Sequence, residues 1–307
     1  MKQCYLIGLL LLFVRCLNAQ DEVIKTFNDR WIINSQSVET LPQRVLDARI
    51  VHRFGDFAGD AGGWATMFGL ENVADVALGV EYGVTDRLTA GLARSKGAGP
   101  LRQLINGSLK FRVLTQELEG GKPVSVALLG MTSLSTSKRS NDPSSVTYFD
   151  LFSHRLVYHG SVLVARNFAD RLSVQLSGGV THRNVVPIGE ENTLLHAGAA
   201  LRLKVTKTLG LIGDLVLPLN GYQSPFSSLR PASANYRTPL GIGLEFNMSN
   251  YVFQLNFTNA TGIMPTDHIP NTRSDWTEGQ FRIGFTFSRM LNFAKRSEEG
   301  AEQFGAR

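Results

Sequence analysis

Cysteine is scarce in this 307-residue chain, and both copies, Cys4 and Cys16, lie within its first nineteen residues. These residues have a basic start at Lys2, an apolar run over 5–14 and tolerated residues up to Ala19, which is the layout of a secretory signal peptide. We therefore expect cleavage after Ala19. The mature chain then has no thiol, which excludes disulfides, zinc–thiolate sites and cysteine nucleophiles.

Long apolar runs and a strong charge of one sign are also missing. Beyond residue 19, no apolar stretch approaches the 18 residues that a transmembrane helix needs. Loss of Lys2 and Arg15 with the signal peptide reduces the 31 Lys and Arg residues to 29, against 26 Asp and Glu residues, so the net charge falls to +3. This small excess, with no basic run, argues against nucleic acid as a partner.

Motifs for catalysis and metal binding are absent as well. The sequence has no GxSxG, no HExxH, no phosphate loop and no dinucleotide fingerprint. Six histidines lie in separate segments, and no two have the i,i+4 spacing that brings metal ligands together on a helix. We therefore expect no catalysis, no cofactor and no metal.

The sequence does contain a regular alternation of polar and apolar residues from residue 45 onward. In 104–115, for example, Leu109 and Phe111 fall on one face of a strand, while Ser108 and Lys110 fall on the other. This period of two is typical of β-strands with one apolar face. It predicts twelve strands, at 45–54, 73–83, 87–95, 104–115, 123–134, 154–166, 171–182, 193–205, 209–218, 238–248, 250–259 and 278–290.

The connections between these strands sort by length. Connections after even-numbered strands are short, whereas those after odd-numbered strands are mostly long, including 55–72, 135–153, 219–237 and 260–277. An even number of strands with this alternation is typical of transmembrane β-barrels, whose turns are periplasmic and whose loops are external. A soluble β-sandwich or lipocalin alternates its faces too, but has no reason to sort its loops. We predict an all-β fold: a closed antiparallel barrel of about twelve strands in a bacterial outer membrane.

This fold divides the chain into four parts. Residues 1–19 are the signal peptide, and 20–44 form a polar periplasmic segment with a short apolar knot, Trp31–Ile33, which makes it a candidate plug. Residues 45–293 form the barrel. The charged tail, 294–307, is expected to lie in the periplasm.

Several motifs in the chain resemble those of one family. They include RWIIN at 30–34, HRFG at 52–55, YGVTDRLT at 82–89 and VFQLNFTN at 252–259. These strings resemble an uncharacterised outer-membrane β-barrel family found mainly in Bacteroidota, over roughly residues 30–293. The resemblance implies the barrel fold and carries no assigned biochemical activity.

Polar residues on the inner strand faces are candidates to line the lumen. Six of them are Lys or Arg and three are Asp or Glu, so we predict a small pore or solute-transfer channel with a small anionic solute as its candidate partner. Other expected partners are outer-membrane lipid and the barrel-assembly machinery. The lumen candidates are Arg49, Glu81, Lys110, Arg112, Gln175, His196, Arg202, Lys204, Asp214, Glu245, Gln254, Asn256 and Arg282.

Two other functions stay open. In one, the barrel is a structural or docking protein whose lumen is blocked by charge pairs and by residues 20–44. In the other, His159 and Ser161, which share a strand face, act as a base and nucleophile in a lipid hydrolase. That chemistry needs an orienting acid and access to lipid, whereas Arg155 on the same face favours the lumen.

Overall fold

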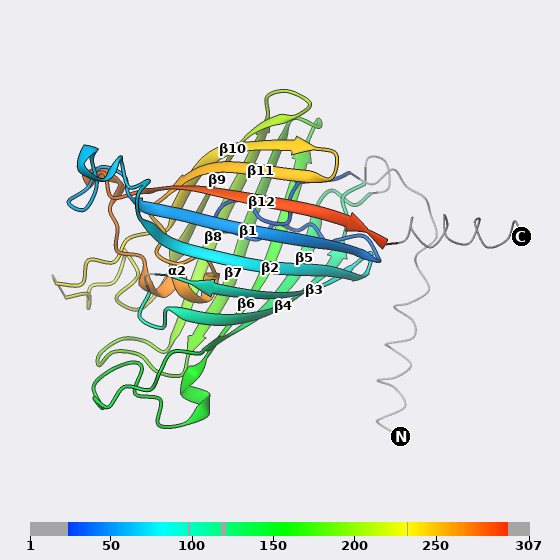
Figure 1. Ribbon diagram of the computed structural model, residues 1–307. Coiled ribbons are helices and arrows are strands. Elements are labelled where there is room, and N and C mark those ends of the chain that lie inside the picture. Colours follow the sequence, from blue (N-terminus) through cyan, green and yellow to red (C-terminus); the bar gives the residue numbers. More distant parts are fainter. Residues whose placement is uncertain (1–23, 98, 118–120, 232, 294–307) are drawn as a thin grey trace, which may run out of the picture.

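The computed structural model describes residues 24–97, 99–117, 121–231 and 233–293, so the predicted signal peptide and the charged tail lie outside the described residues. Twelve strands are antiparallel to their neighbours, and the pairing of the first strand with the last closes them into a barrel (Figure 1). The strands are β1 (Val45–Asp56), β2 (Val73–Thr85), β3 (Leu88–Lys96), β4 (Gln103–Leu114), β5 (Ser125–Ser135), β6 (Leu156–Phe168), β7 (Leu172–Arg183), β8 (Thr193–Lys204), β9 (Leu209–Pro218), β10 (Leu240–Met248), β11 (Tyr251–Thr258) and β12 (Arg282–Asn292).

The predicted closed barrel of about twelve strands is confirmed. One strand boundary is wrong by four residues: β12 begins at Arg282 and not at 278. The Asp275 side chain accepts a hydrogen bond from the Thr277 amide and starts the 3₁₀ turn η3 (Trp276–Glu278), which ends at Gly279 with a φ of 72°. A left-handed residue interrupts a strand, so pairing starts beyond it.

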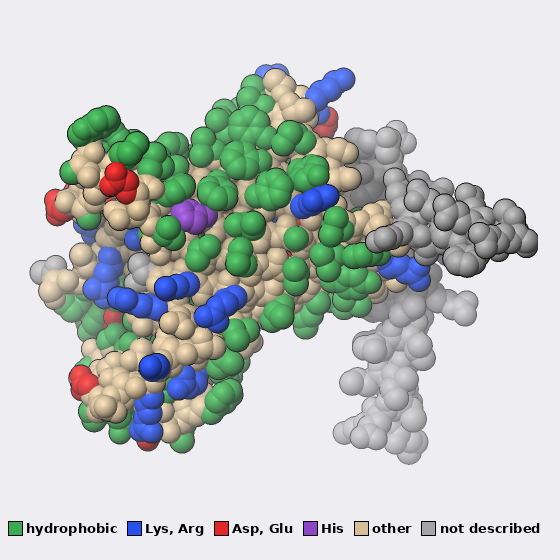
Figure 2. All heavy atoms as spheres, in the orientation of Figure 1, with side chains coloured by type: hydrophobic (Ala, Val, Ile, Leu, Met, Phe, Trp, Pro, Cys, Tyr) green, Lys and Arg blue, Asp and Glu red, His purple; other side chains and the backbone are tan. Residues whose placement is uncertain are grey.

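Side chains alternate between the two sides of the barrel wall. In β4, Leu109 is 57% exposed and points outward, whereas the adjacent Lys110 is 4% exposed and points inward. Apolar side chains cover much of the outer wall (Figure 2). An outward-facing apolar band of this kind is the lipid-facing surface of a transmembrane barrel. The closed sheet also satisfies the backbone hydrogen bonds of every strand within the bilayer.

Short helical elements occur in the long connections: η1 (Trp64–Thr66), η2 (Phe152–Arg155) and α2 (Pro265–Asn271). In the part of the chain that the structure describes, no helix has the length and apolar character to span a bilayer. We call the end of the barrel that carries the long connections the loop end, and the opposite end the turn end. Helix α2 lies at the loop end and contacts the strands β5, β6, β7 and β9.

Candidate functional site

The interior of the barrel is filled by the chain's own N-terminal segment, residues 24–41, which we call the plug. Its apolar residues Phe27, Ile32, Ile33 and Val38 are almost fully buried. They pack against small or branched side chains of the inner wall, namely Ala127, Leu163, Ala165, Ala200 and Ile212. The wall residues there are mostly small, which leaves room for the plug inside a twelve-stranded barrel.

Ion pairs attach one side of the plug to β1 and β2. The two terminal nitrogens of Arg49 donate to the carboxylate of Asp29 at 2.8 and 2.6 Å, and Arg49 also pairs with Asp47 at 2.9 Å. Arg30 of the plug pairs with Asp47 at 2.5 Å and with Glu81 at 2.9 Å. Burial alone would raise the pKa of Asp29, but the charges and hydrogen bonds of Arg49 and Arg30 lower it to about 2. The plug carboxylate is therefore held ionised.

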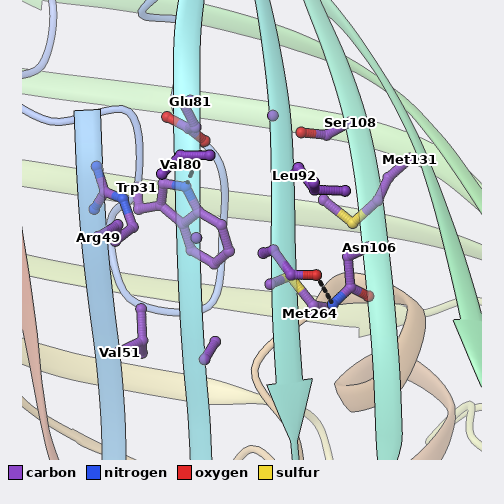
Figure 3. Close-up of a pocket in the computed structure, with 14 residues that line it drawn as sticks. Trp31, Arg49, Val51, Val80, Glu81, Leu92, Asn106, Ser108, Met131 and Met264 are labelled. Atoms are coloured by element: carbon purple, nitrogen blue, oxygen red, sulfur yellow. Dashed lines mark hydrogen bonds between the residues drawn. The ribbon is translucent and has the colours of Figure 1, made fainter. Parts of the chain in front are cut away.

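Trp31 lies beside this charge network. Its indole nitrogen donates to Glu81 at 3.0 Å, and Figure 3 shows its ring directed towards the sulfur-bearing side chains Met131 and Met264. The cavity between them has a volume of about 30 Å³, which is enough for a water molecule. The packing around Trp31 is thus close to complete.

Hydrogen bonds also attach the plug to β9. The chain reverses at Asn34, where the Ser37 amide donates to the Arg30 carbonyl at 2.8 Å. Asp214 of β9 accepts from the Asn34 amide at 2.7 Å and from its side chain at 2.9 Å. A Cβ at Gly241 would lie 2.9 Å from the Asn34 side chain, so glycine is needed there for the plug to approach β10.

A second insert enters from the loop end. It comprises residues 260–272, including α2, and we call it the α2 loop. Thr266 and Ser133 hydroxyls lie 2.5 Å apart, and the Nε2 of His268 donates to the Asn34 carbonyl at 3.1 Å. Arg53 of β1 donates to the Gly262 carbonyl and, at 2.8 Å, to the Asn34 side-chain oxygen. The plug and the α2 loop therefore meet at Asn34.

The structure places most of the predicted lumen residues on the inner wall, where the two inserts bury them. None of the following is more than 6% exposed: Arg49, Lys110, Gln175, His196, Arg202, Asp214, Glu245, Gln254 and Asn256. Their partners are plug atoms in several cases. Lys110 donates to the carbonyls of Arg30 and Glu39, and Gln175 accepts from the Val38 amide at 2.9 Å.

The other four candidates differ in their surroundings. Glu81 and Arg282 are partly buried in ion pairs, and Arg112 lies 3.6 Å from the carboxylate of Glu39. Lys204 lies at the rim of the turn end, where it pairs with Asp170 of the adjacent turn at 2.5 Å.

Sequence reasoning missed the residues that complete this network. Asp47 and Arg53 share the inner face of β1 with Arg49, so the strand period would have identified them. No periodic pattern in the sequence identifies the plug residues Asp29, Arg30 and Asn34, because the plug has no regular secondary structure.

His159 and Ser161 both point into the barrel and away from lipid. The Nδ1 of His159 lies 3.0 Å from the Thr181 hydroxyl, and its ring stacks on His196 at 5.0 Å. Together with His268 they line a cavity of about 30 Å³. The position that an orienting acid would occupy is thus taken by a threonine, and this arrangement gives no support to a lipid hydrolase. Within the described ranges, no group of three or more His, Cys, Asp or Glu side chains is arranged to hold a metal ion.

A larger cavity, of about 430 Å³, opens among the connections of the loop end. Its charged and aromatic lining consists of Arg183, Glu190, Tyr236, Asp267 and Arg273. Glu190 pairs with Arg183 at 3.0 Å, and the Tyr236 hydroxyl donates to the same carboxylate. We call this cavity the vestibule; it has the size of small-molecule sites, and the α2 loop forms its floor.

Comparison with known proteins gives one family and several solved structures. The family described as membrane bound beta barrel domain (DUF5777) matches residues 27–291. The COG4313 outer membrane channel from Pseudomonas putida F1 is 13% identical, with a TM-score of 0.49 over 84% of this chain and 100% of that chain. The KdgM porin is 9% identical, with a TM-score of 0.46 over 80% and 98% of the two chains. Outer membrane phospholipase A from Escherichia coli is 10% identical, with a TM-score of 0.41 over 80% and 92%. No curated protein matches the chain.

Proposed function

Since the chain belongs to the family of membrane bound beta barrel domains (DUF5777) and its barrel lies in the outer membrane, we propose that it is a channel held closed by its own plug. One observation carries the proposal: inner-wall charges such as Arg49 and Lys110 are buried against plug atoms, and Arg202 is buried in a pair with Glu245, so these charges do not face a water-filled pore. By the lengths of the connections, the turn end faces the periplasm, and the plug enters from that side.

Several features support a plug that moves. Its isolated β-bridge, Trp31 with Gln36, lies within the plug itself, so withdrawal would break no strand pairing of the barrel. Besides the apolar packing, the plug contacts the wall through hydrogen bonds and ion pairs, which water can replace once the segment leaves. The barrel wall is closed without the plug, since β1 pairs with β12.

Once the plug leaves, the inner wall would carry its basic residues without their plug partners. Lys110 and Arg49 would then lose the plug carbonyls and the Asp29 carboxylate that they now contact and would face water, and rings of Lys or Arg favour anions in a pore. Small anionic solutes are therefore the proposed cargo, and the vestibule is the proposed entry from outside.

The test is conductance in planar bilayers with a reducible lock on the plug. Thr26 and Ser125 hydroxyls lie 3.2 Å apart, so the double variant T26C/S125C can form a disulfide between plug and β5 with little movement. No other thiol is expected in the mature chain. We expect openings in the native protein, none in the oxidised lock, and their return on reduction; T26C alone is the matched control.

The outcomes separate the candidate functions. If the oxidised lock conducts like T26C, the plug is not the gate. If the native protein and a variant lacking residues 24–41 both fold but carry no current, the barrel is a structural or docking protein with a permanently filled lumen. If openings occur but reversal potentials in a salt gradient show cation preference, the proposal of anionic cargo is wrong, whereas the proposal that the plug closes the channel is unaffected.

A further inference from the structure

Basic side chains occupy an unusual position on the lipid-facing wall. In β3, Arg94 and Lys96 share the outward face with Leu92, which is 59% exposed. Arg102, in the short connection to β4, is exposed as well. We call these three residues the basic patch. Figure 2 shows Lys and Arg side chains gathered over the loop ends of β3 and β4, beside the apolar belt.

The basic patch has no ion-pair partner among the described residues. Among the described residues, none of the ion pairs includes Arg94, Lys96 or Arg102. Basic side chains on the lipid face of a barrel are destabilising to a degree that depends on depth. An anionic group supplied from outside the chain would offset this cost for the two successive outward positions of β3.

An apolar groove leads away from the patch along the outer wall. Its volume is about 520 Å³, and Arg94 forms part of its lining. Arg94 pairs across the sheet with Leu78 and Ile105, which both line the groove together with Ile50, Val80 and Leu92. A groove of this kind fits an acyl chain, and the patch at its rim fits the headgroup of the same molecule.

We infer that the basic patch and the groove bind a phosphorylated glycolipid of the outer leaflet, with its phosphate on Arg94 and Lys96 and an acyl chain in the groove. Arginine and lysine both bind phosphate through charge-assisted hydrogen bonds. The loop end faces outward in the orientation assigned above, which places the patch at the outer leaflet. The site does not depend on whether the lumen opens.

The experiment measures lipid retained by the intact protein in neutral detergent micelles, by native mass spectrometry. Lipid A is compared with the same lipid after its phosphates are removed, and with vesicles of phosphatidylglycerol. The variant R94Q/K96Q is compared with R166Q, because Arg166 is also an exposed basic residue on the outer wall but lies near the turn end of β6. Folding of each variant is checked by circular dichroism.

We expect the native protein and R166Q to retain lipid A, and R94Q/K96Q to bind it about 30-fold more weakly, since two basic contacts are lost. Binding to the native protein should also weaken as salt rises, which tests the charges without any variant. Equal binding by R94Q/K96Q and R166Q would overturn the inference. If the phosphate-free lipid is retained as well as lipid A, only the apolar groove binds and the inference is overturned. If phosphatidylglycerol is retained as well as lipid A, the basic patch binds any anionic lipid, and the inference is overturned too.

Discussion

Two adjacent residues of the α2 loop should respond to pH in opposite directions. Burial and the nearby Asp75 carboxylate raise the pKa of Asp267 to about 7, although Asn271 donates to it and Arg53 and Arg282 lie near. Burial and the charge of Arg53 lower the pKa of His268 to about 3, although its bond to Asn34 opposes the shift. At pH values between these two pKa values, both side chains are therefore neutral in the docked loop.

The sign of each contribution follows from its shift. Asp267 goes from 3.8 to about 7, so its contribution to docking is fully present below pH 3.8 and is lost as pH rises to about 7. His268 goes from 6.5 to about 3, so its contribution is fully present above pH 6.5 and is lost as pH falls to about 3. Each shift of about 3 units corresponds to about 4 kcal/mol. Because the two act in opposite directions, docking of the native loop should vary little with pH.

Replacing one of the two residues leaves the pH dependence of the other uncompensated. D267N keeps a neutral side chain and leaves the histidine, so the loop should loosen on acidification from pH 7 to pH 4. H268Q leaves the carboxyl, so the loop should loosen as pH rises from 4 to 8. The opening equilibrium should change roughly 200-fold across the window of D267N and roughly 600-fold across that of H268Q.

The measurement is the labelling rate of T266C, a position only 3% exposed in the docked loop, divided by the rate of a free peptide thiol at the same pH. T266C without the second change is the control and should give a nearly flat profile. A flat profile in both double variants, or slopes of the reverse sign, would refute the opposed titration of Asp267 and His268.

Three further predictions concern the barrel and its plug. A cysteine at Ser144, in the long connection before β6, should be labelled in intact cells, and one at Asp86, in the turn after β2, should not; the reverse pattern would invert the orientation. Leu201→Arg should lower the free energy of unfolding by about 2–4 kcal/mol in denaturant, because Leu201 faces lipid. Ser177→Ala on the inner face should cost far less, and equal costs would contradict the register. Arg49→Gln removes the bidentate partner of the buried Asp29 carboxylate and leaves it with the more distant Arg30 at 3.6 Å. This change should weaken plug docking by up to about 3–5 kcal/mol and make the plug sensitive to added protease; unchanged resistance would count against the ion-pair network.

The barrel could be predicted from the sequence because each strand repeats the same local rule. Apolar and polar side chains alternate wherever one face meets lipid and the other the interior, as Leu109 and Lys110 illustrate, and this pattern needs no knowledge of distant residues. The start of β12 was misplaced because the Asp275 cap and the left-handed Gly279 act locally against a strand period that continues through them.

The state of the lumen could not be predicted in the same way. The plug has no period that specifies which wall residue each of its side chains meets, and contacts such as Asn34 with Asp214 join residues 180 positions apart. The pattern that placed Lys110 on the inner face did not indicate whether it meets water or the carbonyls of a plug. Inner-wall polarity is therefore compatible with an open pore and with a filled one.

Asn34 links the plug, the α2 loop and the barrel wall through its hydrogen bonds. Its carbonyl accepts from His268 and its side-chain oxygen accepts from Arg53 and Thr258, while its two nitrogens donate to Asp214. Residues from the α2 loop and from three strands thus bind this single asparagine of the plug, and moving it disturbs all of them. If release of the α2 loop makes release of the plug easier by some factor, thermodynamic reciprocity requires that release of the plug makes release of the α2 loop easier by the same factor. Two binding events on opposite sides of the membrane would then be allosterically coupled while every strand stays in place.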